Sequence, residues 1–369
     1  GSKIAFQSKV FPGAADDEAN NEEKQARAQR KYTDPAYDTR PTRQWDNRRA
    51  DTQGHLVVQD AIAGAPATDL LAGSELVGTP GFQGAPSLSG NDLKAAWAPD
   101  GKSLVFNATV NLDQAAHASV VYHLYRVSLE GDEPKKLTDS EDWSCTGPEF
   151  SADGKWLYCS VSPENKRVYN HDEIGRFKWK KRGKLGEPEL LTAGFDRSPG
   201  GFDLSDDGET IYFTAADAGR SRVFSVSASG GEVSMLDSES RGVYAGIRAA
   251  GGHLVARWES SATPAEVVRV NPEGGHDALS AFNSERIVGV DMPAFREFWF
   301  ESSKGRRIHS WLALPPGFDE KKKYPLVLQI HGGPFSSSMD AGHVRWDALL
   351  LAAPGYVVLM TDYTGSVGY

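Results

Sequence analysis

Two glycines that follow an apolar run are the residues in this sequence with the clearest chemical potential. Leu326–Ile330 is apolar, and His331, Gly332, Gly333 and Pro334 follow it directly. Because glycine has no Cβ, its backbone N–H can approach a reacting group closely. The N–H of Gly333 could donate to the oxyanion of a tetrahedral intermediate, a contact worth about 3–4 kcal/mol of barrier. We therefore expect acyl transfer to water, with Gly333, Gly332 and His331 forming the oxyanion-hole loop.

The nucleophile of such a reaction is missing from the sequence. None of the 369 residues forms a Gly-x-Ser-x-Gly motif, and Ser366 has Gly368 at +2 but Thr364 at −2. Ser366 is therefore interpreted as a loop residue. His331 is expected to shape the loop or to hydrogen-bond nearby backbone rather than to react. The alternative for the glycines is a tight turn without catalysis.

The segments around this motif predict a sheet that positions it. An amphipathic stretch, 343–353, follows the motif and leads into a second apolar run, 356–360. Strands that alternate with helices are typical of a parallel α/β sheet, and α/β-hydrolases place one wall of the oxyanion hole at a strand that ends in His-Gly-Gly. Upstream, 296–301 and 308–314 alternate as two antiparallel strands. We expect residues 292–369 to be the N-terminal part of an α/β-hydrolase domain.

A repeat organises the residues before this domain. An Asp-Gly turn followed by a β-branched and aromatic strand occurs at Ala98–Gly101, Ser151–Gly154 and Ser205–Gly208, at spacings of 53 and 54 residues, with a weaker copy at Ala250–Ala256. An alternating strand, a glycine turn and a closing leucine follow each copy, as in the segments that end at Leu137, Leu236 and Leu279. Four short strands per repeated unit predict a β-propeller over residues 1–291, since a β-sandwich lacks so long a period.

The repeat also predicts where the sequence starts within a blade. Gly1–Phe6 aligns with Gly101–Phe106, so we expect about five blades, an incomplete set, and a chain truncated at both ends. Extra residues at 14–45 form an insertion, in which Ala14–Lys31 is a polar helix candidate with an i,i+4 pair of Glu23 and Arg27. The insertion could be a lid beside the active site or a neutral surface excursion.

The composition of the chain limits the classes of binding partner and ligand that we expect. The net charge of −10 argues against nucleic acid and anionic membranes, although plain solubility explains it as well, and no apolar run reaches the ~18–20 residues of a membrane span. No histidine pattern indicates a metal, and no cofactor is expected. Cys145 and Cys159 fall nearly opposite each other across the turn at Ser151–Gly154, which leaves open a disulfide or two thiols. A disulfide would favour the periplasm or secretion over the cytoplasm.

A set of short motifs carries a family resemblance: Arg43–Asp46, Gly194–Ser198, Trp311–Leu312, Pro315–Asp319, Tyr324–Val327, His331–Pro334 and Gly365–Tyr369. In this order and spacing the chain resembles the prolyl oligopeptidase family of serine peptidases (S9), in particular its acylaminoacyl-peptidase and dipeptidyl-peptidase V branch. It departs from the family at Thr364, where an arginine is common, so a contact made by that arginine is in doubt.

The resemblance implies peptide hydrolysis by a Ser-Asp-His triad beyond Tyr369, under a propeller that admits only short peptides. The partners would be such peptides and the remainder of its own polypeptide, with a homo-oligomer left open and this chain alone inactive. The anion that would hold a substrate's α-amine stays unassigned; the candidates by charge are Glu18, Glu22, Glu23, Asp172 and Glu173. The alternatives are a propeller interaction module with a vestigial hydrolase segment, and an esterase of the same fold.

Overall fold

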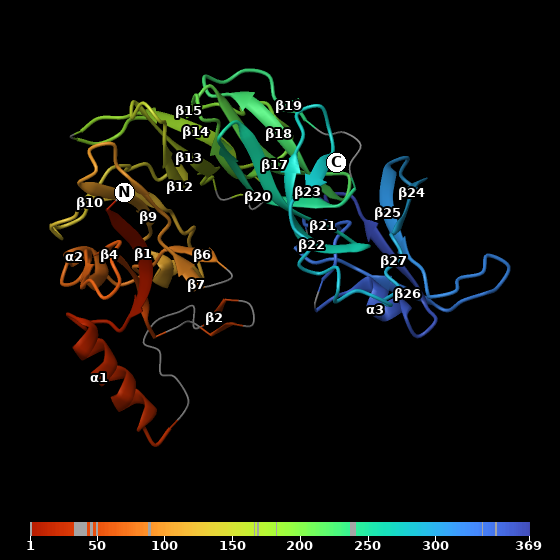
Figure 1. Cartoon of the computed structure of the whole chain (residues 1–369), viewed down its shortest axis with the longest axis horizontal. Helices are drawn as coiled ribbons and strands as arrows, with labels where there is room; N and C mark the ends of the chain where they lie inside the picture. The colour runs from red at the N-terminus through yellow and green to blue at the C-terminus, as the bar shows by residue number, and fades with distance from the viewer. Residues whose placement is uncertain are drawn as a thin grey trace. The chain divides into compact units, whose positions relative to one another are not determined.

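The computed structural model describes residues 2–32, 43–44, 47–48, 51–87, 90–165, 167, 170–181, 183–236, 241–333, 335–343 and 345–369. Side chains of residues 43, 44, 47, 48, 85–87, 90 and 91 are not described. The expectations on Gly1, Trp45, Asp46 and Pro334 therefore lie outside the described residues. Two compact units make up the chain, Gly1–Leu190 and Leu191–Tyr369 (Figure 1). The predicted domain boundary at 291–292 falls inside the second unit and stays a prediction.

The first unit is built mainly from antiparallel sheets. One has the order β1-β4-β5, a second β11-β10-β9-β8 and a third β12-β13-β14-β15, and two strand pairs, β2-β3 and β6-β7, accompany them. Their bounds are β1 Lys3–Val10, β2 Arg43–Gln44, β3 Asn47–Arg48, β4 Gln53–Asp60, β5 Ala67–Asp69, β6 Ala85–Ser87, β7 Gly90–Asp92, β8 Ala95–Trp97, β9 Ser103–Ala108, β10 His123–Ser128, β11 Lys135–Lys136, β12 Trp143–Phe150, β13 Trp156–Pro163, β14 Glu173–Lys178 and β15 Glu189–Leu190. The helices are α1 Asp17–Ala28, α2 Glu75–Gly78 and the short 3₁₀ turn Leu112–Gln114.

The second unit has two four-stranded antiparallel groups, β16 to β19 and β20 to β23, joined by one parallel pair, Ser221 with Val243. A further sheet has the order β24-β25-β27-β26. The bounds are β16 Pro199–Leu204, β17 Thr210–Asp217, β18 Arg220–Ser227, β19 Ser234–Met235, β20 Val243–Ala250, β21 His253–Ser260, β22 Thr263–Val270, β23 His276–Ala278, β24 Arg296–Glu301, β25 Arg307–Ala313, β26 Leu326–Gln329, α3 Ala348–Ala352 and β27 Val357–Asp362.

The predicted Asp-Gly turn has the same geometry in its three strong copies. The N–H groups of Gly101, Gly154 and Gly208 donate to the carbonyls three residues earlier, at 2.9, 2.9 and 2.8 Å. All three glycines have φ between 63° and 72°, the left-handed region that other residues adopt only with strain. In each copy the aspartate before the glycine also accepts the N–H two residues after itself. The repeat is therefore a repeat of structure.

The closing leucines complete each group. The N–H groups of Leu137, Leu236 and Leu279 donate to the carbonyls of Leu124, Val223 and Val267 at 2.7, 2.9 and 2.8 Å. Each leucine thus connects the end of its group of strands to the expected alternating strand by a backbone hydrogen bond. Short antiparallel strands closed in this way are the organisation that propeller blades require, while the number of blades stays a prediction.

The polar helix of the insertion forms as its charges predict. Asp16 caps α1 by accepting the N–H of Ala19 at 2.8 Å, and Glu23 pairs with Arg27 one turn later at 2.5 Å. No residue of α1 is buried, so packing does not explain the helix; the cap and the charge order do. No described helix of the chain is long and apolar enough to span a membrane.

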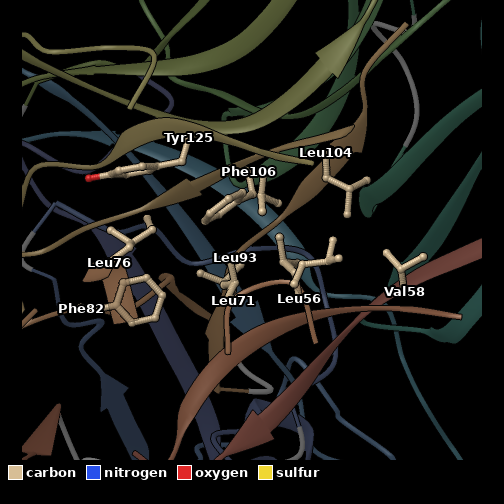
Figure 2. Packing of buried hydrophobic residues seen from close by; sticks show 12 residues of the cluster. Leu56, Val58, Leu71, Leu76, Phe82, Leu93, Leu104, Phe106 and Tyr125 are labelled. Atoms are coloured by element: carbon tan, nitrogen blue, oxygen red, sulfur yellow. The ribbon is translucent and has the colours of Figure 1, made fainter. Parts of the chain in front are cut away.

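The core of the first unit lies between its sheets. Figure 2 shows side chains from β4, β9 and β10, including Leu56, Phe106 and Tyr125, meeting Leu71 and Phe82 from the connecting segments. A neighbouring cluster contains Cys145 and Cys159, which the structure joins by a disulfide with a Cα–Cα distance of 5.9 Å. The register places Val161, not Cys159, directly opposite Cys145, because the strands pair as Phe150 with Leu157 next to the turn and the irregularity between Thr146 and Glu149 shifts this pairing by only one residue. Cys159 is two residues along the strand, on the same face.

The last sheet positions the His-Gly-Gly motif. β24 and β25 form the expected antiparallel hairpin, β25 is antiparallel to β27, and β26 is parallel to β27. The predicted helix over 343–353 was too long: among its described residues, only Ala348–Ala352 is α-helical. Asp347 caps this helix, and His343 Nδ1 accepts the N–H groups of Arg345 and Trp346, which makes a separate turn.

Candidate active site

The loop after β26 has the backbone expected of an oxyanion-hole loop. Gly333 has φ of +128°, and a Cβ at this position would lie 2.7 Å from Ser336 N and 2.9 Å from Phe335 N. Only glycine fits there, whereas Gly332 has open space around it. Both glycines are exposed, and no hydrogen bond to another described residue occupies the N–H of Gly333. This N–H is therefore free to donate to a ligand.

His331 is held by the loop that follows β27. Its Nδ1 lies 3.0 Å from the Gly332 carbonyl, and its Nε2 lies 2.9 Å from Ser366 Oγ. The ring stacks on Tyr363 at 4.5 Å between centroids, and the Tyr363 hydroxyl donates to the His331 carbonyl at 3.1 Å. Both ring nitrogens face neighbouring atoms of the protein, which suits a residue that shapes the loop.

The contacts of Ser366 argue against an activated nucleophile. Its hydroxyl donates to the Tyr363 carbonyl at 2.7 Å, so its proton is directed away from His331. The nearest carboxylate, Asp362, lies 3.5 Å from the same Nε2 that faces Ser366. In a triad the base uses one nitrogen for the serine and the other for the carboxylate, and this arrangement lacks that division.

Asp362, at the end of β27, is the centre of a buried polar cluster. Its Oδ1 accepts the N–H of Ser338 at 2.7 Å. Its Oδ2 lies 3.0 Å from His309 Nδ1 and accepts the Tyr369 hydroxyl. Burial acts to raise the pKa of Asp362, but the hydrogen bonds from His309, Ser338 and Tyr369 outweigh it and hold that pKa below its usual value. Burial, reinforced by the hydrogen bond to Asp362, raises the pKa of Tyr369.

The cluster continues to the hairpin between β17 and β18. His309 Nε2 lies 3.2 Å from Glu297 Oε1, and Arg220 donates to both oxygens of Glu297. Burial acts to raise the pKa of Glu297, and the hydrogen bond and charge of Arg220 hold it below its usual value. Arg220 also lies over the Trp311 ring at 5.0 Å. The carboxylates are therefore charged and compensated.

A second buried carboxylate, Asp340, lies at the far end of the same loop. It is 0% exposed. Its Oδ2 accepts the N–H of Gly242 at 3.0 Å, and its Oδ1 accepts the N–H and the hydroxyl of Ser261 at 3.2 and 2.6 Å. These donors lie at the start of β20 and between β21 and β22, outside the sheet that carries β26.

Comparisons with known proteins agree with these motifs, although no family model matches the chain. The chain is 24% identical over 281 residues to dipeptidyl-peptidase 5 of Porphyromonas gingivalis, covering 74% of this chain and 40% of that protein. It is 27% identical over 252 residues to dipeptidyl-peptidase 5 of Schizosaccharomyces pombe, covering 67% and 35%. The solved structure of the acylaminoacyl peptidase of Pyrococcus horikoshii matches this chain with a TM-score of 0.66 and 17% identity. The match covers 100% of this chain and 50% of that protein.

The chain is similar to serine peptidases of the prolyl oligopeptidase family. It spans about half the length or less of the relatives it matches. The likeness to the solved peptidase, at 17% identity, is one of fold. It supports the expected combination of propeller and hydrolase, whose blade count and hydrolase part stay predictions.

Several site residues of this chain were not found from the sequence: Glu297, His309, Asp340, Asp362 and Tyr369. A signal existed for Asp362, since a carboxylate directly after an apolar strand is unusual and lies where parallel sheets place functional groups. The others carry no local pattern. They meet only through contacts between segments far apart in sequence.

The candidate amine-binding acids all belong to the first unit. Glu18, Glu22 and Glu23 belong to α1 in the first unit, where Glu23 pairs with Arg27 and Arg30. Asp172 accepts the Ser162 hydroxyl at 2.6 Å, and Glu173 begins β14 in the same unit. The residue that would hold a substrate's α-amine stays unassigned. Within the described part of the chain, no group of three or more His, Cys, Asp or Glu side chains is arranged so that it could hold a metal ion.

Proposed function

We propose that this chain is the propeller and the first part of the catalytic domain of a serine exopeptidase. The enzyme releases dipeptides or acylated residues from the N-termini of short peptides. The loop His331–Gly333 supplies an oxyanion donor, most directly the N–H of Gly333. A Ser-Asp-His triad from residues beyond Tyr369 supplies the nucleophile and its base.

The conformation of Gly333 is the observation that carries this proposal. Gly333 has φ of +128° and no room for a Cβ, and it is exposed. It follows the carboxyl end of β26, which pairs in parallel with β27. Such an end is where parallel sheets present functional groups. Relatives named dipeptidyl-peptidase 5 support a peptidase, and the share of their length left unmatched provides room for a triad.

Labelling with a fluorophosphonate tests the position of the nucleophile. The reagent reacts covalently with activated serines. We expect labelling of a polypeptide extended to the length of the relatives, at a serine beyond Tyr369. We expect none in the 369-residue chain, with heat-denatured protein as the control for non-specific reaction. Labelling of the 369-residue chain at Ser366 or any other serine would refute this assignment.

Substrate assays on the extended polypeptide separate the two specificities. Chromogenic acetyl-Ala, Ala-Ala and Gly-Phe substrates distinguish an acylaminoacyl peptidase from a dipeptidyl peptidase, because the first needs a blocked α-amine and the second a free one. Turnover of at least one is expected. An enzyme that cleaves simple esters and none of the three peptides would instead be an esterase of the same fold.

A further inference from the structure

We propose that the buried carboxylates Asp340 and Asp362 are positioning residues, which together hold the loop His331–Asp340 and so place the N–H of Gly333. The inference rests on the proposed function, because it concerns the same oxyanion donor. It adds that the donor is placed by strands β20 to β22 as well as by the sheet that carries it.

The loop needs external support. Its described residues form no helix or strand, so no regular backbone ladder fixes their positions. An oxyanion donor works only when it is already in place before the reaction, and displacement by about 1 Å can cost 10²-fold in rate. Groups that bond the loop from outside therefore decide how well Gly333 is positioned.

Asp362 holds the loop from the side of β27. It accepts the N–H of Ser338 and lies 3.5 Å from His331 Nε2, so one carboxylate contacts the loop near its beginning and near its end. The carboxylate itself is immobilised by His309 and Tyr369. Hydrogen bonds to an ionised, buried acceptor are stronger than neutral ones, and breaking one partner is costly.

Asp340 holds the loop from the side of β20 to β22. Its three side-chain hydrogen bonds all come from Gly242 and Ser261, and its own N–H donates to the Gly219 carbonyl at 2.8 Å. The hairpin tip at Gly219 also packs without space against the loop: a Cβ there would lie 3.0 Å from the Ser338 carbonyl and 2.5 Å from Trp311 Nε1. Movement of β20 to β22, or of the β17–β18 hairpin, should therefore displace the loop.

Two isosteric variants test this, Asp340→Asn and Asp362→Asn. Each replaces an accepting oxygen by an NH₂ group that faces donors. In the extended, active polypeptide we expect kcat to fall at least tenfold with KM changed less than twofold, because the donor acts on the transition state. In the 369-residue chain we expect amide hydrogen exchange of peptides covering 331–338 to accelerate at least tenfold.

Asp203→Asn is the matched control. This carboxylate also joins two strands, accepting the Ala249 N–H at 2.8 Å between β16 and β20, but it does not contact the loop. It should change neither kcat nor exchange at 331–338. Where Asp340→Asn does not fold, Ser261→Ala removes one hydroxyl donor to Asp340 and should accelerate exchange of the loop two- to fivefold.

The outcomes separate the two proposals. A wild-type polypeptide without peptidase activity refutes the proposed function, while the exchange experiment still decides whether the carboxylates hold the loop. Active variants with wild-type kcat and wild-type exchange overturn the inference. A rise in KM with kcat unchanged also overturns it, since that result assigns the carboxylates to substrate binding.

Discussion

The disulfide between Cys145 and Cys159 should stabilise the first unit by about 3 kcal/mol. The two cysteines are 14 residues apart, and cross-linking a loop of about 15 residues removes roughly that much conformational free energy from the unfolded state. Both sulfurs lie in a cluster with Val105, Leu124 and Phe177, and both cysteines are 0% exposed. Breaking the bond therefore acts mainly on the unfolded chain.

Urea unfolding with and without dithiothreitol measures this contribution. Reduction should lower the urea midpoint of the transition of the first unit by about 1–1.5 M, given an m-value of about 2–3 kcal/mol/M. The variant Cys145→Ala/Cys159→Ala should unfold at a lower midpoint than the oxidised protein and should not respond to the reductant. This second comparison separates loss of the cross-link from any other effect of dithiothreitol.

Two results would refute the reasoning. The first is titration of two free thiols in unreduced protein under denaturing conditions, which would show that no bond exists. The second is an equal midpoint for oxidised and reduced protein. In that case the bond would exist but the unfolded chain would remain compact enough that the cross-link removes little freedom.

Two further predictions concern a buried histidine and the glycine of the loop. Burial, aided by the charge of Lys136, lowers the pKa of His123 to about 4. In the unfolded state this imidazole binds its proton near pH 6.5, so the contribution of neutral His123 to folding stability is complete above that pH. It is lost as the pH falls to 4, by roughly 3 kcal/mol. His123→Gln should therefore flatten the fall in melting temperature over this range, and His253→Gln, at an exposed position, should not. Gly333→Ala should lower kcat of the extended polypeptide about 10²-fold, because a Cβ would collide with Ser336 N. Gly342→Ala, where nothing lies within 4 Å, is its control; equal activities would remove Gly333 from the oxyanion hole.

Local structure was largely predictable from the sequence because its causes are local. Each Asp-Gly turn needs only a glycine at positive φ and a side chain that bonds the N–H two residues later. The helix α1 needs only its cap and its charge order. The glycines of the loop were recognisable for the same reason. The residues that leave no room for a Cβ at Gly333, Phe335 and Ser336, are only two and three positions further along the chain.

The sequence predicted helix bounds and strand register less well where side-chain contacts override the local apolar pattern. The apolar spacing of 343–353 indicated one helix, yet the side chain of His343 binds two backbone N–H groups and ends that pattern before Asp347. The pairing of Phe150 with Leu157 beside the turn, and the one-residue shift between Thr146 and Glu149, put Val161 opposite Cys145, a register that alternation alone does not contain.

The sequence by itself determined the turns, most strands, the family motifs and the loop that could bind an oxyanion. Only the tertiary structure decided what holds that loop. Asp362 lies 53 residues from His309, and Asp340 lies 98 residues from Gly242 and 79 from Ser261. No residue spacing encodes these contacts. They exist because burial makes an unpaired carboxylate costly, so each one is placed where folded segments bring donors to it.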